Sequence, residues 1–448
     1  MSKAKLLIAA LLILSIITTP VLSYSEGYYE NTVQFEGNYT HVYHVNITTG
    51  YFSINVSGAI IVPPSIYGDY LIVTTSGPFN YMTRGVYEML GCVYAINIFN
   101  GKILWKDVFP NQIMTQPIIV NGTVIVGLGN NFFVTCDLRG NGTNEIVALN
   151  VKDGKILWNY STLGEDMPTP AYYDGLIIEA NGNGCVFALN MSGYPVWKDY
   201  ITSYDSMSSI LLVNGTIYFG SAEPYVFWAI NATNGKIIWF DNLTELFPNE
   251  TIHGLDDSSP AYYNGIVVTS FTFVINSTTV QDMLMGLNAT NGKILWFFDE
   301  GEGPTPPNLN SPPEVIYDGI VFHDTPSAGI LYAINLTNGK PLWKVRTGPT
   351  TSNVNIYNNY ALIQNASGTL FVINITNGSV VRELKLLAIP GPGNLLITKN
   401  SLIAVGLNGE VQAVPLSLLL GKTTHNRIII PVIKVIVKLI KMLLHNVF

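Results

Sequence analysis

Acidic side chains gather in the longer segments between the predicted strands of this chain. They are Glu165, Asp166, Glu245, Glu250, Asp256, Asp257, Asp299, Glu300 and Glu302. Carboxylate oxygens are the ligands that Ca²⁺ prefers, so these acids predict a calcium site if the fold brings several of them together. The alternative is a set of solvated loop acids, because Asp and Glu are mostly exposed in proteins.

Two histidines lie close in sequence to an acid, His253 to Asp256 and His323 to Asp324. They stand far apart in the chain and make no recognisable metal-ligand spacing. We therefore expect each imidazole to be exposed or to be satisfied by a local partner.

The chain has three cysteines, Cys92, Cys136 and Cys185, and no Cys-x-x-Cys pair, which argues against a zinc or thioredoxin-like site. Cys92 and Cys185 stand in the related phrases GCVYA and GCVFA, each at the start of a predicted strand. Cys136 lies in the segment between them. A disulfide bridge from Cys136 to Cys92 or to Cys185 is therefore a prediction.

One recurring phrase supplies the framework that must position these residues. NATNGKIIW at 231–239 and NATNGKILW at 288–296 are two of eight copies, whose turn glycines are Gly50, Gly101, Gly154, Gly193, Gly235, Gly292, Gly339 and Gly378. Each copy predicts a short apolar strand, an Asn-Gly or Asp-Gly turn of type I′, and a second strand. Six copies end on Trp, with Ile54 and Arg382 in the other two, and the spacing is close to the ~40–50-residue period of propeller blades.

A second hairpin, of the type AYYNGIVVTS at 261–270, recurs between the copies of the first. With its strands named A and B, and those of the first hairpin C and D, the order A-B-C-D holds for seven units. The eighth unit lacks strand D, and a spare strand D lies at 51–56. We predict an all-β fold, an eight-bladed propeller of four-stranded antiparallel blades closed by the N-terminal strand, because closure removes exposed sheet edges. A β-sandwich or an open solenoid is the alternative.

The N-terminal end differs from this body. Residues 1–23 combine Lys3 and Lys5 with an apolar stretch and Ser23, which predicts a secretory signal peptide; an uncleaved anchor is the alternative. Residues 24–39 form a lead-in, and residues 40–420 form the propeller.

The C-terminal end, 421–448, predicts a cationic amphipathic helix. Lys434, Lys438 and Lys441 share one face of it, and the other face is apolar. Such a helix is expected to lie on a membrane surface, with docking on a partner or on the propeller as the alternative. The formal net charge is −8 although basic residues gather at both ends, so the body is more acidic still and should repel nucleic acid.

Sequons of the form Asn-x-Ser or Asn-x-Thr fall repeatedly in the tight A–B and C–D turns. The glycosylation candidates are Asn46, Asn121, Asn190, Asn214, Asn231, Asn288, Asn335 and Asn374. The longest insertions fall instead in the B–C and D–A connections. We therefore expect glycans on the face that carries the tight turns, here called the turn face, and function on the opposite long-loop face. The alternative is that Asn and Thr are simply good turn residues.

The phrase A-x-N-x-x-[ND]-G-K-x-x-W resembles the tryptophan-docking repeat of the pyrroloquinoline-quinone (PQQ) type propellers, over about residues 40–417. That superfamily includes the quinoprotein alcohol dehydrogenases and the non-enzymatic propeller lipoprotein of the bacterial outer-membrane assembly machine. The resemblance implies that six tryptophans pack between neighbouring blades: Trp105, Trp158, Trp197, Trp239, Trp296 and Trp343. The family's enzymes also carry a disulfide between adjacent cysteines and are longer, and this sequence departs from them on both points.

We expect a secreted or cell-surface, membrane-associated scaffold that binds a protein or a glycan through its long-loop face and needs no cofactor. We do not expect an enzyme. The alternative is a PQQ-dependent, Ca²⁺-assisted dehydrogenase, and no catalytic, cofactor or metal residue is assigned, because one fold hosts many functions.

Overall fold

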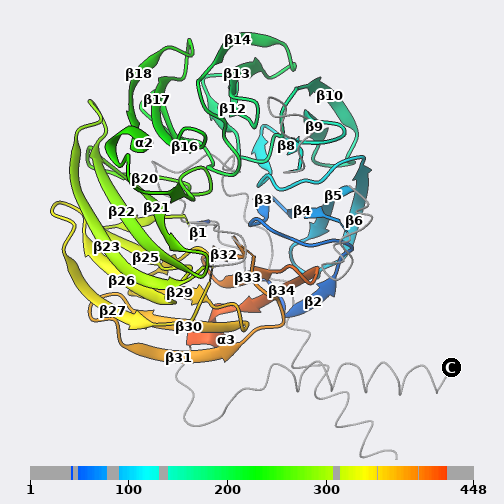
Figure 1. Cartoon of the computed structure of the whole chain (residues 1–448). Coiled ribbons are helices and arrows are strands. Elements are labelled where there is room, and N and C mark those ends of the chain that lie inside the picture. The colour runs from blue at the N-terminus through cyan, green and yellow to red at the C-terminus, as the bar shows by residue number, and fades with distance from the viewer. Residues whose placement is uncertain are drawn as a thin grey trace, which may run out of the picture.

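The protein is a closed ring of eight antiparallel sheets around a central axis (Figure 1). The computed structural model describes residues 42–43, 49–77, 90–130, 140–305, 313–350, 352–391 and 393–420. In each sheet the strands follow one another outwards from the axis and are named A to D. The connections A–B and C–D therefore lie at one end of every sheet, and B–C and D–A at the other.

The first four blades have these strands. Blade 1 has β3 (Ser65–Tyr67), β4 (Tyr70–Ser76), β5 (Gly91–Asn97) and β6 (Ile103–Phe109). Blade 2 has β7 (Ile118–Val120), β8 (Thr123–Leu128), β9 (Glu145–Asn150) and β10 (Ile156–Ser161). Blade 3 has β11 (Ala171–Tyr173), β12 (Leu176–Ala180), β13 (Cys185–Asn190) and β14 (Pro195–Tyr200). Blade 4 has β15 (Leu211–Val213), β16 (Thr216–Ser221), β17 (Val226–Asn231) and β18 (Ile237–Asn242).

The other four blades complete the ring. Blade 5 has β20 (Ala261–Tyr263), β21 (Ile266–Asn276), β22 (Thr279–Asn288) and β23 (Ile294–Pro304), with the short β19 (Ile252–His253) added to β21. Blade 6 has β24 (Val315–Tyr317), β25 (Ile320–Asp324), β26 (Ile330–Asn335) and β27 (Pro341–Arg346). Blade 7 has β28 (Asn355–Tyr357), β29 (Tyr360–Gln364), β30 (Thr369–Asn374) and β31 (Val380–Lys385). Blade 8 has β1 (Val42–Tyr43), β32 (Leu395–Thr398), β33 (Ser401–Val405), β34 (Glu410–Pro415) and β2 (Phe52–Asn55).

The N-terminal strand closes blade 8. β2 pairs antiparallel with β34, with Phe52 opposite Ala413, so the predicted eight-bladed, N-terminally closed propeller is confirmed. The sequence did not reveal β1, which adds a parallel strand on the inner side of β32. The N-terminal chain therefore flanks the last blade on both sides, near the axis and at the rim (Figure 1).

The two kinds of tight turn differ. In the A–B turns, Asn214 (φ 49°) and Gly215 (φ 76°) are both left-handed, as type I′ requires. In the C–D turn that follows Asn231, Gly235 carries the positive φ of 72° and its N–H bonds the carbonyl of Asn231 at 2.9 Å. The strand register shifts between Ala229 and Ile230. The type I′ prediction is thus wrong for the C–D turns, which are longer loops closed by a glycine bulge.

Each of the six tryptophans that end a strand D links its own blade to the next. The indole Nε1 of Trp239 in blade 4 donates to the carbonyl oxygen of Ala289 in blade 5 at 3.0 Å. The equivalent bonds run from Trp105, Trp158, Trp197, Trp296 and Trp343 to Val151, Met191, Ala232, Leu336 and Ile375. The edge of each strand D is thereby tied to the following C–D turn.

The two blades without Trp use other contacts. Register places Phe52, not Ile54, opposite the small residue of strand C in blade 8, because no C–D turn fixes the register there. The Phe52 ring lies against Gly101 of blade 1, as each Trp lies against the next turn glycine. In blade 7, Arg382 donates instead to the carbonyl oxygen of Leu419 at 2.6 Å, in the short helix α3 (Leu416–Leu420).

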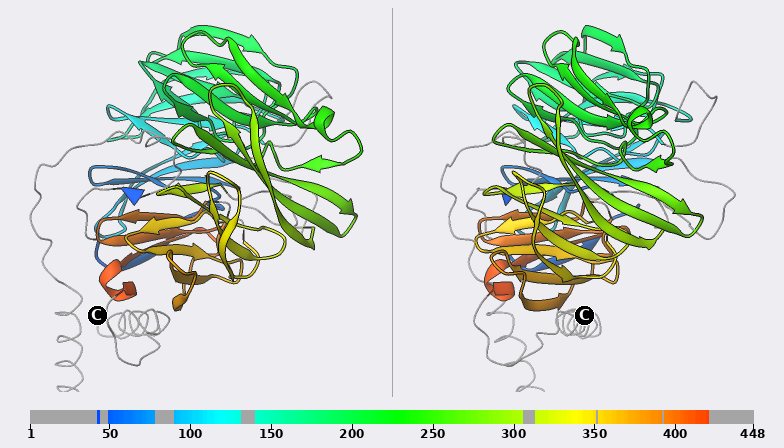
Figure 2. Two further views of the ribbon diagram at one scale, coloured as in Figure 1. Left: turned by 90° about the vertical axis from the view of Figure 1, so that its left-hand side faces the viewer. Right: turned by 60° about the vertical axis from the view of Figure 1, so that its left-hand side comes forward.

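Blade 5 projects beyond the others at its long-loop end (Figure 2). Its strands β21, β22 and β23 have 11, 10 and 11 residues, whereas strands B to D elsewhere have four to seven. The helix α2 (Leu243–Leu246) precedes it, and Phe247 stacks edge-on against Phe273 and Phe297. We call this projection, residues 269–304, the blade-5 arm.

The predicted terminal segments, 1–23, 24–39 and the tail with Lys434, Lys438 and Lys441, lie outside the described residues. Among the residues that are described, no helix is both long and apolar enough to span a membrane.

Candidate functional site

One position of the repeated blade holds a polar residue in some blades and an apolar residue in the others. In blade 6, Trp343 lies opposite Ala333 of strand C, and Ala333 lies opposite Phe322 of strand B. The next residue of strand B points the other way, into the interface with the preceding blade. Around the ring this position holds Val73, Val126, Glu179, Phe219, Thr269, His323, Ile363 and Ala404. The fold accepts an apolar side chain there, so Glu179 and His323 are not needed for packing.

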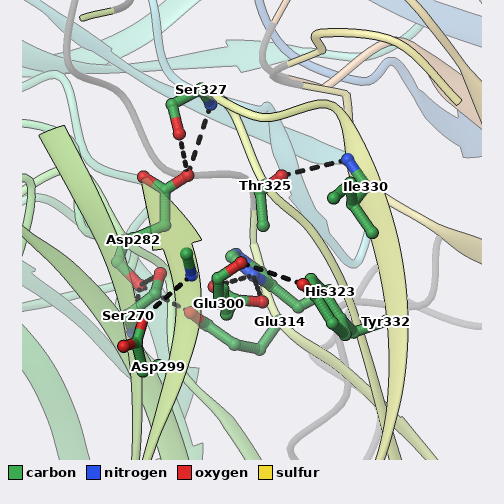
Figure 3. Close-up of polar contacts among 12 residues, drawn as sticks. Ser270, Asp282, Asp299, Glu300, Glu314, His323, Thr325, Ser327, Ile330 and Tyr332 are labelled. Carbon is green, nitrogen blue, oxygen red and sulfur yellow. Dashed lines mark hydrogen bonds and ion pairs between the residues drawn. The ribbon is translucent and has the colours of Figure 1, made fainter. Parts of the chain in front are cut away.

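His323 forms a buried ion pair with Glu300. The imidazole Nδ1 lies 3.0 Å from both Oε1 and Oε2 of Glu300, and both side chains are almost fully buried (Figure 3). The hydroxyl of Tyr332 donates to the backbone oxygen of Glu300 at 2.9 Å. Glu300 belongs to the blade-5 arm and His323 to the end of β25, so the pair ties the arm to blade 6.

Three further buried carboxyl groups lie near enough to this pair to interact with it electrostatically. Asp282 on β22 accepts hydrogen bonds from the hydroxyl and the N–H of Ser327. Glu314, just before β24, accepts from the Ser258 hydroxyl at 2.9 Å. Asp324 accepts from the Thr347 hydroxyl at 2.6 Å. We call Asp282, Glu300, Glu314, His323 and Asp324 the blade-6 cluster.

Each of the three outer carboxyl groups keeps one oxygen without a protein partner. The atoms are Oδ1 of Asp282, Oε2 of Glu314 and Oδ1 of Asp324, all buried. A buried polar atom without a partner costs about 1–3 kcal/mol, and more when it is charged. Such groups are retained at sites of function more often than in packing cores.

The cluster holds its protons to unusually high pH. Burial raises the pKa of Asp282 and of Glu314 to about 7 and that of Asp324 to about 8. Burial opposes the charged form of His323, but the charge and hydrogen bond of Glu300, with lesser help from Glu314 and Asp282, raise its pKa to about 9. In mild acid the three outer carboxyl groups are therefore neutral and the imidazole is cationic.

A second group of buried acids lies across blades 2 to 4. Burial raises the pKa of Asp166, Glu179 and Asp205 well above their ordinary values, and repulsion by neighbouring acids adds to it. Neither carboxyl oxygen of Glu179 has a hydrogen-bond partner. Both acidic groups lie at the long-loop end of their blades.

The acidic residues singled out from the sequence differ in their burial. Glu165, Asp166, Asp256 and Glu300 are buried, whereas Glu245, Glu250, Asp299 and Glu302 are exposed and Asp257 is intermediate. His253 bonds the Tyr225 hydroxyl at 3.0 Å, and burial lowers its pKa. Sequence reasoning missed Glu179, Asp205, Asp282 and Glu314. Alignment of the repeats at the strand-B position would have found Glu179, because it replaces an apolar residue there.

The turn structure explains why Asn recurs in the sequons, but it does not decide whether they are glycosylated. Asn231 Oδ1 accepts the backbone N–H of Thr233 at 2.9 Å, and Asn190, Asn288, Asn335 and Asn374 make the same bond two residues on. So do Asn97 and Asn150, which lie in no sequon. The C–D turn itself therefore favours Asn at this position. Asn121 and Asn214 are exposed at A–B turns, Asn46 lies outside the described residues, and glycosylation stays a prediction.

The disulfide also stays a prediction. Cys92 and Cys185 are free and buried, and Cys136 lies outside the described residues. Burial raises the pKa of Cys185 to about 11, which disfavours its reactive thiolate.

These features define an eight-bladed β-propeller built from one repeated four-stranded blade. A family model described as outer membrane protein assembly factor BamB matches residues 53–221 and 208–414. The chain belongs to this family, and the resemblance to PQQ-type propellers inferred from its repeat is confirmed.

Curated relatives include enzymes. The chain is 30% identical over 400 residues to the tetrathionate hydrolase of Acidianus ambivalens, covering 81% of this chain and 74% of that protein. It is 31% identical over 254 residues to the tetrathionate hydrolase of Acidithiobacillus ferrooxidans, a match that spans 52% of this chain and half of that protein. BamB from Moraxella catarrhalis shares the fold, with a TM-score of 0.58 at 16% identity over 81% of this chain and 99% of that one.

The cofactor prediction is wrong. It expected no cofactor, or PQQ with Ca²⁺ in an enzyme, whereas the enzymes matched at 30% identity are named as hydrolases. Among the described residues, no three or more His, Cys, Asp or Glu side chains are grouped so as to hold a metal ion. The predicted clustering of loop acids into a calcium site fails for a physical reason: the buried acids lie in two separate groups, and the remaining ones face solvent.

Proposed function

We propose that this chain hydrolyses tetrathionate or a closely related polythionate, with the blade-6 cluster as its reaction centre. The observation that supports this most is the buried His323–Glu300 pair, which interacts electrostatically with three buried carboxyl groups that each keep an unpartnered oxygen. A scaffold has no need of these groups, since apolar residues fill the His323 position in most other blades. Two curated relatives, 31% and 30% identical to this chain, are named as tetrathionate hydrolases.

The charges of the cluster suit a dianionic substrate in acid. The cationic imidazole of His323 attracts sulfonate groups, and neutral carboxyl groups donate hydrogen bonds to their oxygens. At higher pH the same carboxyl groups ionise and repel the substrate. Activity should therefore rise as the pH falls below the pKa of about 7 to 8 of these groups.

Hydrolysis also needs groups that exchange protons. Water oxygen bonds to one inner sulfur of tetrathionate, the central S–S bond breaks, and thiosulfate leaves with its electron pair. The other product is the sulfenyl sulfonate HO–S–SO₃⁻, and one water proton goes to a base. A neutral carboxyl group of Asp282, Glu314 or Asp324 donates its proton to the departing thiosulfate sulfur, and the carboxylate so formed is that base, because groups that titrate near the working pH transfer protons best.

The deciding experiment is an assay of the purified full-length chain. Tetrathionate is added between pH 3 and pH 8, and released thiosulfate is measured by ion chromatography. Release that is fastest in acid supports the proposal. No release above the protein-free control at any of these pH values refutes it.

A scaffold role is the second candidate, and the blade-5 arm favours it. The arm exposes Ile275 and Phe297, at 45% and 41%, beside an aromatic cluster built on Phe247. The family model is described by an outer membrane protein assembly factor, so a protein partner at the long-loop face of a cell-surface propeller is a consistent role. The expectations of secretion, glycosylation and membrane attachment belong to this proposal.

One variant distinguishes the hydrolase role from the scaffold role. Replacement of the arm tip, residues 274–280, by a two-residue Asn-Gly turn shortens the arm but leaves the blade-6 cluster in place. An enzyme should keep its thiosulfate release. A scaffold should show no release in either form, and the shortened chain should lose the partner that co-purifies with the intact one.

A further inference from the structure

The interface between blades 7 and 8 contains a set of buried amide side chains that neither proposed role uses. Gln364 ends β29, Gln412 lies in β34, and Asn394 immediately precedes β32; all three are fully buried. Asn353 and Asn355, in and after the connection that enters blade 7, are also fully buried. We call these five residues the amide cluster.

The strand pattern directs these amides into one interface. Asn355 is two residues before Tyr357, whose hydroxyl donates to the Lys399 oxygen of blade 8 at 2.6 Å, and residues two apart share a face of a strand. Gln412 is likewise two residues before Val414, which packs in the apolar core between blades 7 and 8. All these residues lie at the long-loop end of their strands.

Part of the cluster is satisfied internally. Asn394 donates to Gln364 Oε1, and Gln364 Nε2 donates to the Ala388 oxygen at 2.8 Å. The adjacent Leu387 N–H donates to Gln412 Oε1 at 2.9 Å. These bonds fix the orientation of Gln412 and place its Nε2 inside the interface.

The remaining amide atoms of the cluster lack a hydrogen bond of good geometry, and more of them are donors than acceptors. Both amide atoms of Asn353, both of Asn355, and Nε2 of Gln412 are buried without such a bond, although the Gln412 side chain lies close enough to the Tyr51 hydroxyl to act on the pKa of that tyrosine. This holds whichever way the two Asn amides are turned, because neither of their atoms is bonded. Three NH₂ groups offer six N–H donors, against two carbonyl oxygens. A buried position with a surplus of neutral donors suits an oxyanion.

The repeat does not require these amides. The residues equivalent to Gln412 are Tyr94, Val147, Phe187, Trp228, Met285, Tyr332 and Phe371. The residue equivalent to Asn355 is Val315 in blade 6 and Ala261 in blade 5. Buried amides at positions that other blades fill with apolar groups carry a desolvation penalty unless something occupies them.

We infer that the amide cluster binds a sulfate or sulfonate group, held by the N–H donors of Asn353, Asn355 and Gln412. The general oxyanion chemistry follows from the donors alone, and the choice of a sulfur oxyanion rests on the proposed function. The group is either the sulfonate end of a substrate or free sulfate. Because amides do not titrate, this binding is independent of pH, unlike anion binding at the blade-6 cluster.

The test measures binding and not turnover. Sulfate and methanesulfonate are titrated into the full-length protein at pH 8 by calorimetry, with the melting temperature followed in parallel and sodium chloride at matched ionic strength as the reference. We expect saturable binding and a rise in Tm of roughly 2–4 °C at ~100-fold excess over Kd. Binding of sulfate alone indicates a site for the free ion, and binding of both indicates a site that also accepts a sulfonate end.

Two variants restore the residues of other blades, Asn355→Val and Gln412→Met. Each should abolish the saturable binding. The anion-free Asn355→Val protein should melt no lower than the wild type, whereas Gln412→Met, which removes the acceptor of the Leu387 N–H, should melt lower. Asn359→Ser, an exposed amide on the turn face of blade 7, is the matched control and should bind normally. No saturable binding by the wild type, or equal binding by both variants, overturns the inference and leaves ordered water as the occupant. Tetrathionate hydrolysis assayed separately shows whether the proposed function stands or fails on its own.

Discussion

The indole of Trp239 lies against Gly292 of the next blade so closely that an added Cβ on Gly292 would meet the ring at 2.7 Å. The same contact joins Trp105 to Gly154, Trp158 to Gly193, Trp197 to Gly235, Trp296 to Gly339 and Trp343 to Gly378. The turn glycine is thus needed for two reasons: it adopts a positive φ, and its lack of a side chain leaves room for the Trp ring of the preceding blade. Blade spacing around the ring depends on this pair.

Gly292→Ala should therefore destabilise the protein more than a turn alone explains. The matched control is Gly265→Ala, because Gly265 has a similar φ of 85° but an added Cβ would meet nothing within 4 Å. We expect about 1–2 kcal/mol for the control, from the strain of a Cβ at positive φ, and about 1–3 kcal/mol more for Gly292→Ala from overpacking against Trp239. Urea unfolding measures both. Equal losses would show that the Trp contact carries no energy.

The buried His323–Glu300 pair predicts a strongly non-additive double mutant. His323→Leu leaves the Glu300 charge buried and unpaired, which costs about 3–5 kcal/mol. The double variant His323→Leu with Glu300→Gln removes the charge and should recover most of that loss. Unfolding at pH 7 measures the two variants and the wild type. A double variant as unstable as the single one would contradict the assignment of the loss to the unpaired carboxylate.

The buried acids predict that stability falls as the pH rises. Carboxyl groups with raised pKa bind more protons in the folded than in the unfolded chain, so their contribution is complete below the unfolded pKa near 4 and is lost up to about pH 7–8. His323 acts in the same direction, since its pKa rises to about 9 and its contribution is lost between about pH 6.5 and 9. The Tm at constant ionic strength should be higher at pH 4 than at pH 8.

Glu179→Val isolates one part of this dependence. Val occupies the same position in blades 1 and 2, so the variant should melt higher than the wild type at pH 8 and show a smaller difference at pH 4. Its thiosulfate release should be unchanged, because Glu179 lies outside the blade-6 cluster. A lower Tm at pH 8 would mean that Glu179 has a structural partner.

Asp324→Asn tests the reaction centre with little change in shape. The amide oxygen can still accept from the Thr347 hydroxyl, but the group no longer exchanges a proton. We expect thiosulfate release to drop roughly 10²–10⁴-fold with an unchanged melting curve in acid. Asp299→Asn, an exposed carboxylate near Glu300, is the control and should retain wild-type release. Full activity in Asp324→Asn would remove Asp324 from the mechanism.

The ring could be predicted from the sequence because its determinants are local. Asn-Gly turns, alternating apolar strands and Trp at a fixed distance from each turn glycine act within one hairpin. Even there, the type I′ turn at Asn234-Gly235 was wrong, because the Asn231 side chain and a glycine bulge close a longer loop.

The candidate sites could be predicted only in part, because they form between blades. Glu300 was included among the loop acids, but its pairing with His323 depends on the length of the blade-5 arm. Glu314, Asp282 and Gln412 carry no local motif. Each becomes visible only when the register of the folded ring shows which residue other blades place there.

Closure of the ring by β2 has a consequence for how the chain is made. Ser53 bonds Glu410 across 357 residues of sequence, so the strand that completes blade 8 emerges first and finds its partner last. Until then both β2 and β34 present open edges to other chains. Folding should therefore be slow, since contacts so distant in sequence carry a large entropic barrier. The unfolded chain should also aggregate more readily as the protein concentration rises. Once the last edge is paired, no blade can leave without opening a neighbour, and the same topology that delays assembly should make the finished ring long-lived.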